Sequence, residues 1–139
     1  MATNKLRLYF GISIPLFIAH GLEEYINGFY EVDSHSKFLL NPFLSIADYQ
    51  TSFLTFQILF WTFLIVVFFI NKILPKWFSL FIALVYIYEL HHLVKAFSAG
   101  GYYPGLVSAL TLYVIGYLFL KELIKDGRVK LNPSSNIVH

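Results

Sequence analysis

The chain has 139 residues, of which 58% are hydrophobic and 13% are charged; its formal net charge is +2 and it has no cysteine. A typical soluble domain carries about 25% charged residues, so this composition excludes an ordinary soluble protein and indicates an integral membrane protein. The lack of cysteine excludes disulfides, thiolate metal ligands and a cysteine nucleophile. The small net charge gives no support for a nucleic-acid partner.

Four membrane spans are predicted in chain order, over residues 6–22, 49–70, 77–97 and 104–120. Lys5 and Arg7 precede the first apolar run, but no small-residue cleavage site follows, so we expect an uncleaved first span. Residues 30–47 are rich in turn-forming residues and are predicted to form a loop. The fold class expected is all-α: a polytopic integral membrane four-helix bundle over residues 1–122, followed by a disordered cytoplasmic tail over residues 123–139.

The distribution of basic residues predicts the orientation of these spans. Most of the lysines and arginines fall on one side of the predicted membrane, and only Lys37 and Lys95 fall on the other. Cytoplasmic loops carry the excess of positive charge, so both termini are predicted to be cytoplasmic. The simple polytopic design fits a bacterial inner (plasma) membrane, with the lipid bilayer itself as the first partner.

Two clusters of ionisable residues interrupt this apolar background. His20, Glu23 and Glu24 lie late in the first span, and Glu89 and His92 lie late in the third. An ionisable side chain at membrane depth costs on the order of 2.5 kcal/mol or more, so such residues usually have a function. At 1.5 Å per residue, His20, Glu89 and His92 lie roughly 18–23 Å from the cytoplasmic end of their spans, and Glu23 and Glu24 lie slightly further out. The sequence therefore predicts one polar site in the outer half of the bilayer.

The spacing of these residues suits a metal site and equally suits a metal-free relay in which carboxylates orient a histidine. His20, Glu23 and Glu24 stand at i, i+3 and i+4 and share one helix face. Glu-x-x-His, the spacing of Glu89 and His92, is used by carboxylate-bridged metal sites between helices. The predicted ligands of a divalent metal (Zn, Fe or Mn) are His20, Glu23, Glu24 and His92.

Catalytic and supporting roles are predicted for the side chains around the predicted metal. Glu24 and Glu89 are the catalytic candidates, with Glu89 as general base. His91 points about 100° away from His92 on a helix, so we expect it to support the site or lie at its edge. Gln57, in the uncharged second span, is assigned to hydrogen bonding between helices. In the alternative interpretation, the two clusters are ordinary helix ends exposed to water. A third span that ended at Leu90 would, however, hold only about 14 residues, short of the roughly 20 needed to cross a membrane.

The motifs His20-Gly-Leu-Glu23-Glu24, His92 and Tyr102-Tyr-Pro-Gly105 together resemble the HXXEE-domain family, which comprises small membrane proteins of unknown function with about four predicted spans. The resemblance covers roughly residues 10 to 120. In that family an Asn often stands four residues before the histidine; here the position is Tyr88, and Glu89 lies beside it. The resemblance implies an enzyme-like site without an established substrate.

These observations predict an integral membrane metalloenzyme that acts on a lipid-like or amphipathic substrate, with hydrolysis, oxidation and isomerisation all open. Three alternatives remain. A metal-free His/Glu site could act as an acid–base isomerase. A proton-coupled small-molecule transporter would need a homo-oligomer, at least a dimer, because four helices are few for alternating access. An accessory subunit would use the polar residues to bind a partner helix.

Overall fold

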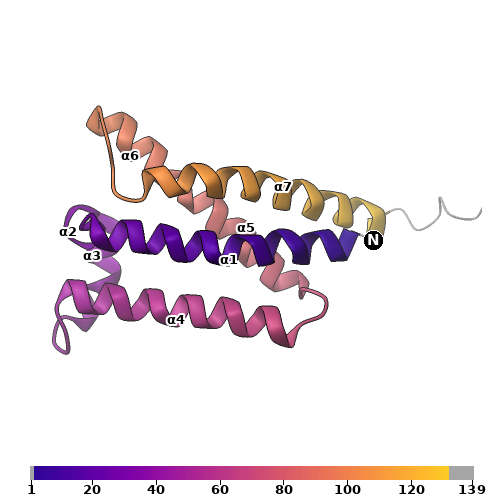
Figure 1. Ribbon diagram of the computed structural model, residues 1–139, viewed down its shortest axis with the longest axis horizontal. Helices are drawn as coiled ribbons and strands as arrows, with labels where there is room; N and C mark the ends of the chain where they lie inside the picture. Colours follow the sequence, from indigo (N-terminus) through magenta and orange to yellow (C-terminus); the bar gives the residue numbers. More distant parts are fainter. Residues whose placement is uncertain (1, 132–139) are drawn as a thin grey trace, which may run out of the picture.

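The computed structural model describes residues 2–131, and this part of the chain is all-α, as predicted (Figure 1). Four long segments are joined by short helices and turns. In chain order the elements are α1 (Ala2–Ile26), α2 (Phe29–Val32), α3 (Ser34–Leu40), the 3-10 helix η1 (Asn41–Phe43), α4 (Tyr49–Ile70), α5 (Lys76–Glu89), α6 (His91–Ala99) and α7 (Leu106–Leu131).

Helix α1 lies between α4 and α7 and packs along both of them (Figure 1). Helix α5 crosses this layer and packs against α7. The core between the helices consists of large apolar side chains, most of them aromatic or branched: Leu6, Phe10 and Phe17 of α1, Leu64 and Val67 of α4, Phe78, Ile82 and Tyr86 of α5, and Leu112 and Phe119 of α7. The position of α1 in the middle brings its polar face against residues from several other helices.

Three helical segments are long and apolar enough to cross a membrane: Tyr49–Ile70, Lys76–Ala99 and Leu106–Gly127. Large apolar side chains cover their outer faces, and Phe69 and Phe97 are 76% and 90% exposed. A soluble protein would not present such a surface to water, so these helices indicate an integral membrane protein. Helix α1 has sufficient length but carries Lys5 and Arg7 near one end and Glu23 and Glu24 near the other. The first predicted span, residues 6–22 within α1, therefore stays a prediction.

The third predicted span is interrupted at Leu90, where α5 ends and α6 begins. A break in an apolar helix leaves backbone carbonyls without their usual partners. Here the hydroxyl of Tyr113 in α7 donates to the carbonyl oxygen of Glu89 at 2.8 Å. A side chain from a neighbouring helix thus supplies a hydrogen bond at the point where the helix is interrupted.

The region predicted as a loop over residues 30–47 is largely helical, because it contains α3 and η1. The buried carboxylate of Asp33 caps α3 by accepting from the Ser36 amide at 2.7 Å, and it also accepts from the Tyr103 hydroxyl at 2.8 Å. Burial opposes the charged form of Asp33, yet these hydrogen bonds outweigh it and lower the pKa of the carboxyl. The cap holds the region against the turn before α7.

The last helix is longer than predicted. The fourth span was expected to end at Leu120, but α7 continues to Leu131, so the start of the predicted disordered tail is helical. Lys125 and Glu122 form an i, i+3 ion pair of 2.9 Å on this extension, which favours helix. Residues 132–139 of the predicted tail lie outside the described residues.

We expect Gly116→Ala in α7 to lower the melting temperature of the detergent-solubilised protein. A Cβ at this position would lie 2.8 Å from Cγ of the buried Tyr86, an atom close to the α5 backbone that cannot move freely. Gly127→Ala is the control in the same helix, since its Cβ would meet nothing within 4 Å. Alanine favours helix over glycine by up to about 1 kcal/mol, so the control should keep or raise the melting temperature. An unchanged Gly116→Ala variant would contradict the close packing of α5 and α7.

Candidate metal centre

Two imidazoles and two carboxylates converge where α1, α5 and α6 meet. Helix α1 contributes His20 and Glu24, α5 ends with Glu89, and α6 contributes His92. Oε2 of Glu89 lies 2.8 Å from Nε2 of His20 and 3.3 Å from Nε2 of His92. Oε1 of Glu24 lies 3.2 Å from Nε2 of His92 and 3.7 Å from Nε2 of His20. Four possible ligand atoms therefore face one small volume.

The site is buried in spite of its polarity. His92 is fully buried, and His20 and Glu24 are only 3% and 6% exposed. The Glu89 side chain is 12% exposed. Water can thus contribute little to the solvation of these groups, so they depend on one another and on their immediate neighbours.

Several of the converging atoms lack a hydrogen bond. Within residues 2–131, Nε2 of His20, both ring nitrogens of His92 and Oε2 of Glu89 are buried without a hydrogen-bond partner. The imidazole nitrogens do lie within ion-pair distance of the carboxylate oxygens, but that attraction requires a protonated histidine. Leaving a buried polar atom unpaired costs about 1–3 kcal/mol. A shared cation would satisfy several of these atoms at once.

The separations agree with ligands of a common ion. With bonds of about 2.0–2.2 Å to nitrogen and oxygen, two ligand atoms on a tetrahedral Zn²⁺ lie about 3.3 Å apart. Ligand atoms of His20, Glu89 and His92 all lie within 4.8 Å of one another. The three side chains can therefore hold a metal ion, and the Glu24 oxygen lies close enough to join them.

Ser108 of α7 determines which nitrogen His20 presents to the site. The Ser108 hydroxyl donates to Oε2 of Glu23 at 2.5 Å, and its oxygen lies 2.9 Å from Nδ1 of His20. Because the hydroxyl hydrogen is directed at the carboxylate, the Ser108 oxygen accepts the Nδ1–H of His20. Neutral His20 then presents the lone pair of Nε2, as a metal ligand requires.

Glu23, a predicted ligand, is not brought into this group. Its carboxylate accepts from the backbone amides of Ser108 at 2.7 Å and Val107 at 3.1 Å, and from the Tyr102 hydroxyl at 2.8 Å. Glu23 therefore caps the N-terminus of α7, where amides lack partners within the helix and negative charge is favoured. Burial and the adjacent Glu23 carboxylate raise the pKa of Tyr102 to about 12, so its hydroxyl remains a donor.

The structure also shows which groups Gln57 and His91 contact. Gln57 of α4 does bond to another helix: its Nε2 donates to Oε2 of Glu24 at 3.0 Å, which fixes that carboxylate. An amide in the interior of an uncharged apolar span was the available signal for this role. His91 turns its Nδ1 to the Tyr88 carbonyl at 3.0 Å, and its ring lies 4.0 Å from that of His92.

The turn before α7 covers the site with backbone. Gly105 adopts a φ of +89°, and a Cβ there would lie 2.7 Å from Cε1 of His92 and 2.8 Å from Cε1 of His20. Beside it, the ring of Phe29 lies 5.3 Å from the His92 ring, and that of Tyr103 lies 5.9 Å from it. Burial and the Asp33 carboxylate raise the pKa of Tyr103, so its hydroxyl stays protonated and keeps its bond to α3.

Comparison with known proteins agrees with the motif. A family model described as a protein of unknown function with an HXXEE motif matches residues 12–120. The chain belongs to the HXXEE family. No curated protein and no solved structure matches the chain. In this HXXEE protein the motif residues are divided: His20 and Glu24 face the buried group, whereas Glu23 caps α7. The matched residues include every side chain of the candidate metal centre.

We expect Gly105→Ala to reduce metal binding strongly, because the new Cβ would displace both imidazoles and the residue would be strained at positive φ. Gly100→Ala separates these two effects, since Gly100 has a φ of +68° but open space around its Cβ. Metal titration of both purified variants checks the prediction. Equal affinities would show that the turn does not form part of the site.

We expect Ser108→Ala to weaken metal affinity by about 10- to 100-fold, the usual effect of losing a group that orients a histidine ligand. The His20 ring would lose its partner at Nδ1 while Nε2 remained in place. Thr111→Ala, one turn along α7, is the matched control because Thr111 is exposed and bonds only to a backbone carbonyl. A similar affinity for the two variants would contradict the role of Ser108.

Proposed function

We propose that the protein is an integral membrane metalloenzyme in which His20, His92 and Glu89 bind a divalent metal. The observation that carries this proposal is the buried convergence of ligand atoms that lack hydrogen bonds. Two imidazoles and a carboxylate suit Zn²⁺, Fe²⁺ or Mn²⁺. We also propose that α1 is a fourth span and that both termini are cytoplasmic, as the charge distribution predicts.

The two carboxylates receive different roles. The Glu89 oxygen approaches both imidazoles, which favours a ligand rather than a free base. One oxygen of Glu24 accepts from Gln57, and the other faces the site. Glu24 is therefore better placed than Glu89 to act as the general base, and it could also serve as a fourth metal ligand. A bound divalent metal would supply a Lewis acid beside this carboxylate. Glu24 would then hold or transfer a proton at Oε1.

The surroundings support an amphipathic substrate. Three exposed leucines lie close in the sequence to the site residues: Leu22, Leu90 and Leu93. A lipid-like molecule could approach across this apolar surface while its polar group reached the histidines and carboxylates. Hydrolysis, oxidation and isomerisation remain compatible with the residues present.

Metal content tests the proposal. The untagged full chain is purified in detergent without chelators, and its metals are measured by plasma mass spectrometry. We expect about one Zn, Fe or Mn per chain in the wild type and less than about a tenth of that in His20→Ala/His92→Ala, because two ligands are lost. Helix content by circular dichroism shows whether the variant folds.

His35→Ala serves as the control, because His35 lies on α3 with 63% of its side chain exposed. It should retain the metal. Glu89→Gln keeps the side-chain size and should lower metal content as well. Metal retained in the double histidine variant, or no metal in the wild type, would refute the proposal.

A metal-free acid–base site is the second candidate, favoured by the 2.8 Å separation of His20 Nε2 and Glu89 Oε2. At this distance the two atoms could share a proton, as in a double-bond isomerase. A folded, metal-free wild type would select this function.

A further inference from the structure

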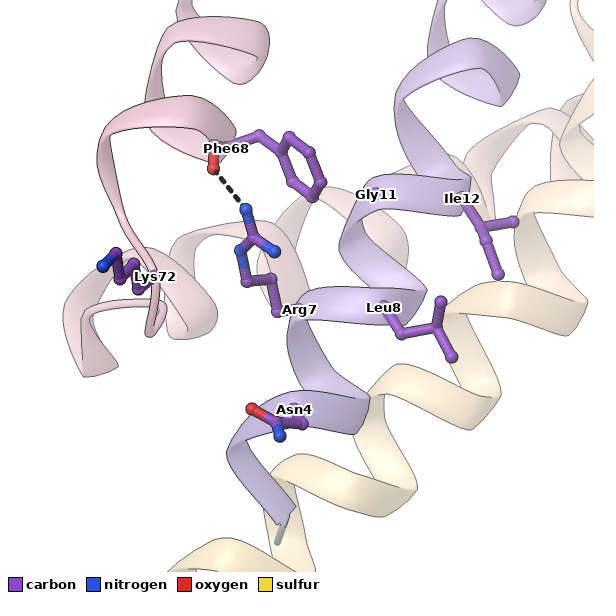
Figure 2. A pocket seen from close by; sticks show the side chains of 7 residues that line it. All are labelled: Asn4, Arg7, Leu8, Gly11, Ile12, Phe68 and Lys72. Carbon is purple, nitrogen blue, oxygen red and sulfur yellow. Dashed lines mark hydrogen bonds between the residues drawn. The ribbon is translucent and has the colours of Figure 1, made fainter.

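A groove with a volume of about 560 Å³ lies near the N-terminal end of α1, far from the metal centre (Figure 2). Arg7 and His20 are separated along α1 by about 20 Å at 1.5 Å per residue. The groove is formed by α1 and by the end of α4 with the turn that follows. Its lining includes the polar Asn4, Arg7 and Lys72 and the apolar Leu8, Ile12 and Phe68.

Arg7 is held firmly at the centre of this groove. Its Nε donates to the Asn71 carbonyl at 3.1 Å. Its Nη2 donates to the Phe68 carbonyl at 3.2 Å, the bond drawn in Figure 2. The guanidinium also lies over the Phe68 ring, 4.3 Å from its centroid. A guanidinium has five N–H donors, so these bonds leave three for a ligand. Its position at the end of α4 is thus fixed before any ligand binds.

The charge in the groove is unbalanced. Arg7 and Lys72 line it, and among the residues that the structure describes no carboxylate does. Lys72 is exposed, directly after the end of α4, and its ammonium group is free to move toward a ligand. Guanidinium and ammonium groups together match a phosphate, since one offers a fork of donors and the other a mobile point charge.

The apolar side of the groove extends along α1. Leu8 and Ile12 lie one turn apart on the same face and are 58% and 42% exposed. Phe68 of α4 also lines the groove, beside Gly11 of α1 (Figure 2). A small inorganic anion would leave this surface uncovered, whereas the acyl chain of a lipid would cover it. Basic pockets between membrane helices commonly bind anionic head groups in this way.

We propose that this groove binds a phospholipid with an anionic head group. The phosphate lies between Arg7 and Lys72, and an acyl chain follows Leu8 and Ile12. This site is independent of the proposed metal centre, and it would fix the depth at which α1 and α4 sit in the bilayer.

Native mass spectrometry of the detergent-solubilised full chain tests the proposal, with titrations of phosphatidylglycerol and of phosphatidylcholine with the same acyl chains. We expect the wild type to retain phosphatidylglycerol preferentially. Lys72→Gln should weaken this binding by about fivefold, the effect of one cation on an anionic lipid. Lys72 is exposed and forms no hydrogen bond or ion pair within residues 2–131, so this variant is expected to keep the fold.

Three comparisons decide the result. Lys37→Gln removes the same charge from exposed α3 and should bind lipid as the wild type does. Arg7→Lys should keep part of the binding, whereas Arg7→Gln should lose it. Millimolar inorganic phosphate should not displace the lipid. Equal binding of the two lipids, equal losses in Lys37→Gln and Lys72→Gln, or displacement by phosphate would overturn the proposal. Metal content should be unchanged in Lys72→Gln, which separates this test from that of the metal centre.

Discussion

The cap that Glu23 forms on α7 is the interaction on which the polar interior depends. The first amides of a helix have no partner within it, and in an apolar environment they must find one elsewhere. Glu23 supplies it from α1, and in doing so fixes α1 and α7 in register. The same contact places Ser108 beside His20 and brings the backbone of Gly105 onto the two imidazoles. One carboxylate thus connects helix packing to the geometry of the site.

The residues of the HXXEE motif contact different neighbouring helices. Residues at i, i+3 and i+4 share a helix face, but a face of three residues is wide enough to meet two neighbours. His20 and Glu24 turn toward α5 and α6, while Glu23 turns toward the start of α7. Two adjacent glutamates therefore have different positions: Glu23 caps α7, and Glu24 faces the buried histidines. A low-dielectric interior makes both contacts strong and makes an unpaired group costly.

The break at Leu90 gives the other half of the site its shape. It separates Glu89, the last residue of α5, from His92 in the first turn of α6. Tyr113 satisfies the carbonyl at the break, so the interruption is built into the packing of α7 rather than left open. At the other end of α1, Arg7 performs a related task for α4 by donating to its last carbonyls. Side chains from neighbouring helices thus donate hydrogen bonds to backbone carbonyls both at the break near Leu90 and at the end of α4.

The sequence by itself determined the helical class, three apolar spans and the five ionisable residues among which the four that meet are found. Composition and 3.6-residue periodicity depend only on local order, and ionisable residues in an apolar chain stand out without any structure. It could not assign Glu23, because spacing along one helix does not say which neighbour each side chain faces. Nor could it find Ser108 or Gly105, since an ordinary serine and a turn glycine carry no signal of what lies beside them. Only the tertiary structure decided these roles, because the partner of Glu23 is more than 80 residues away in the chain and reaches it only through the packing of α1 against α7.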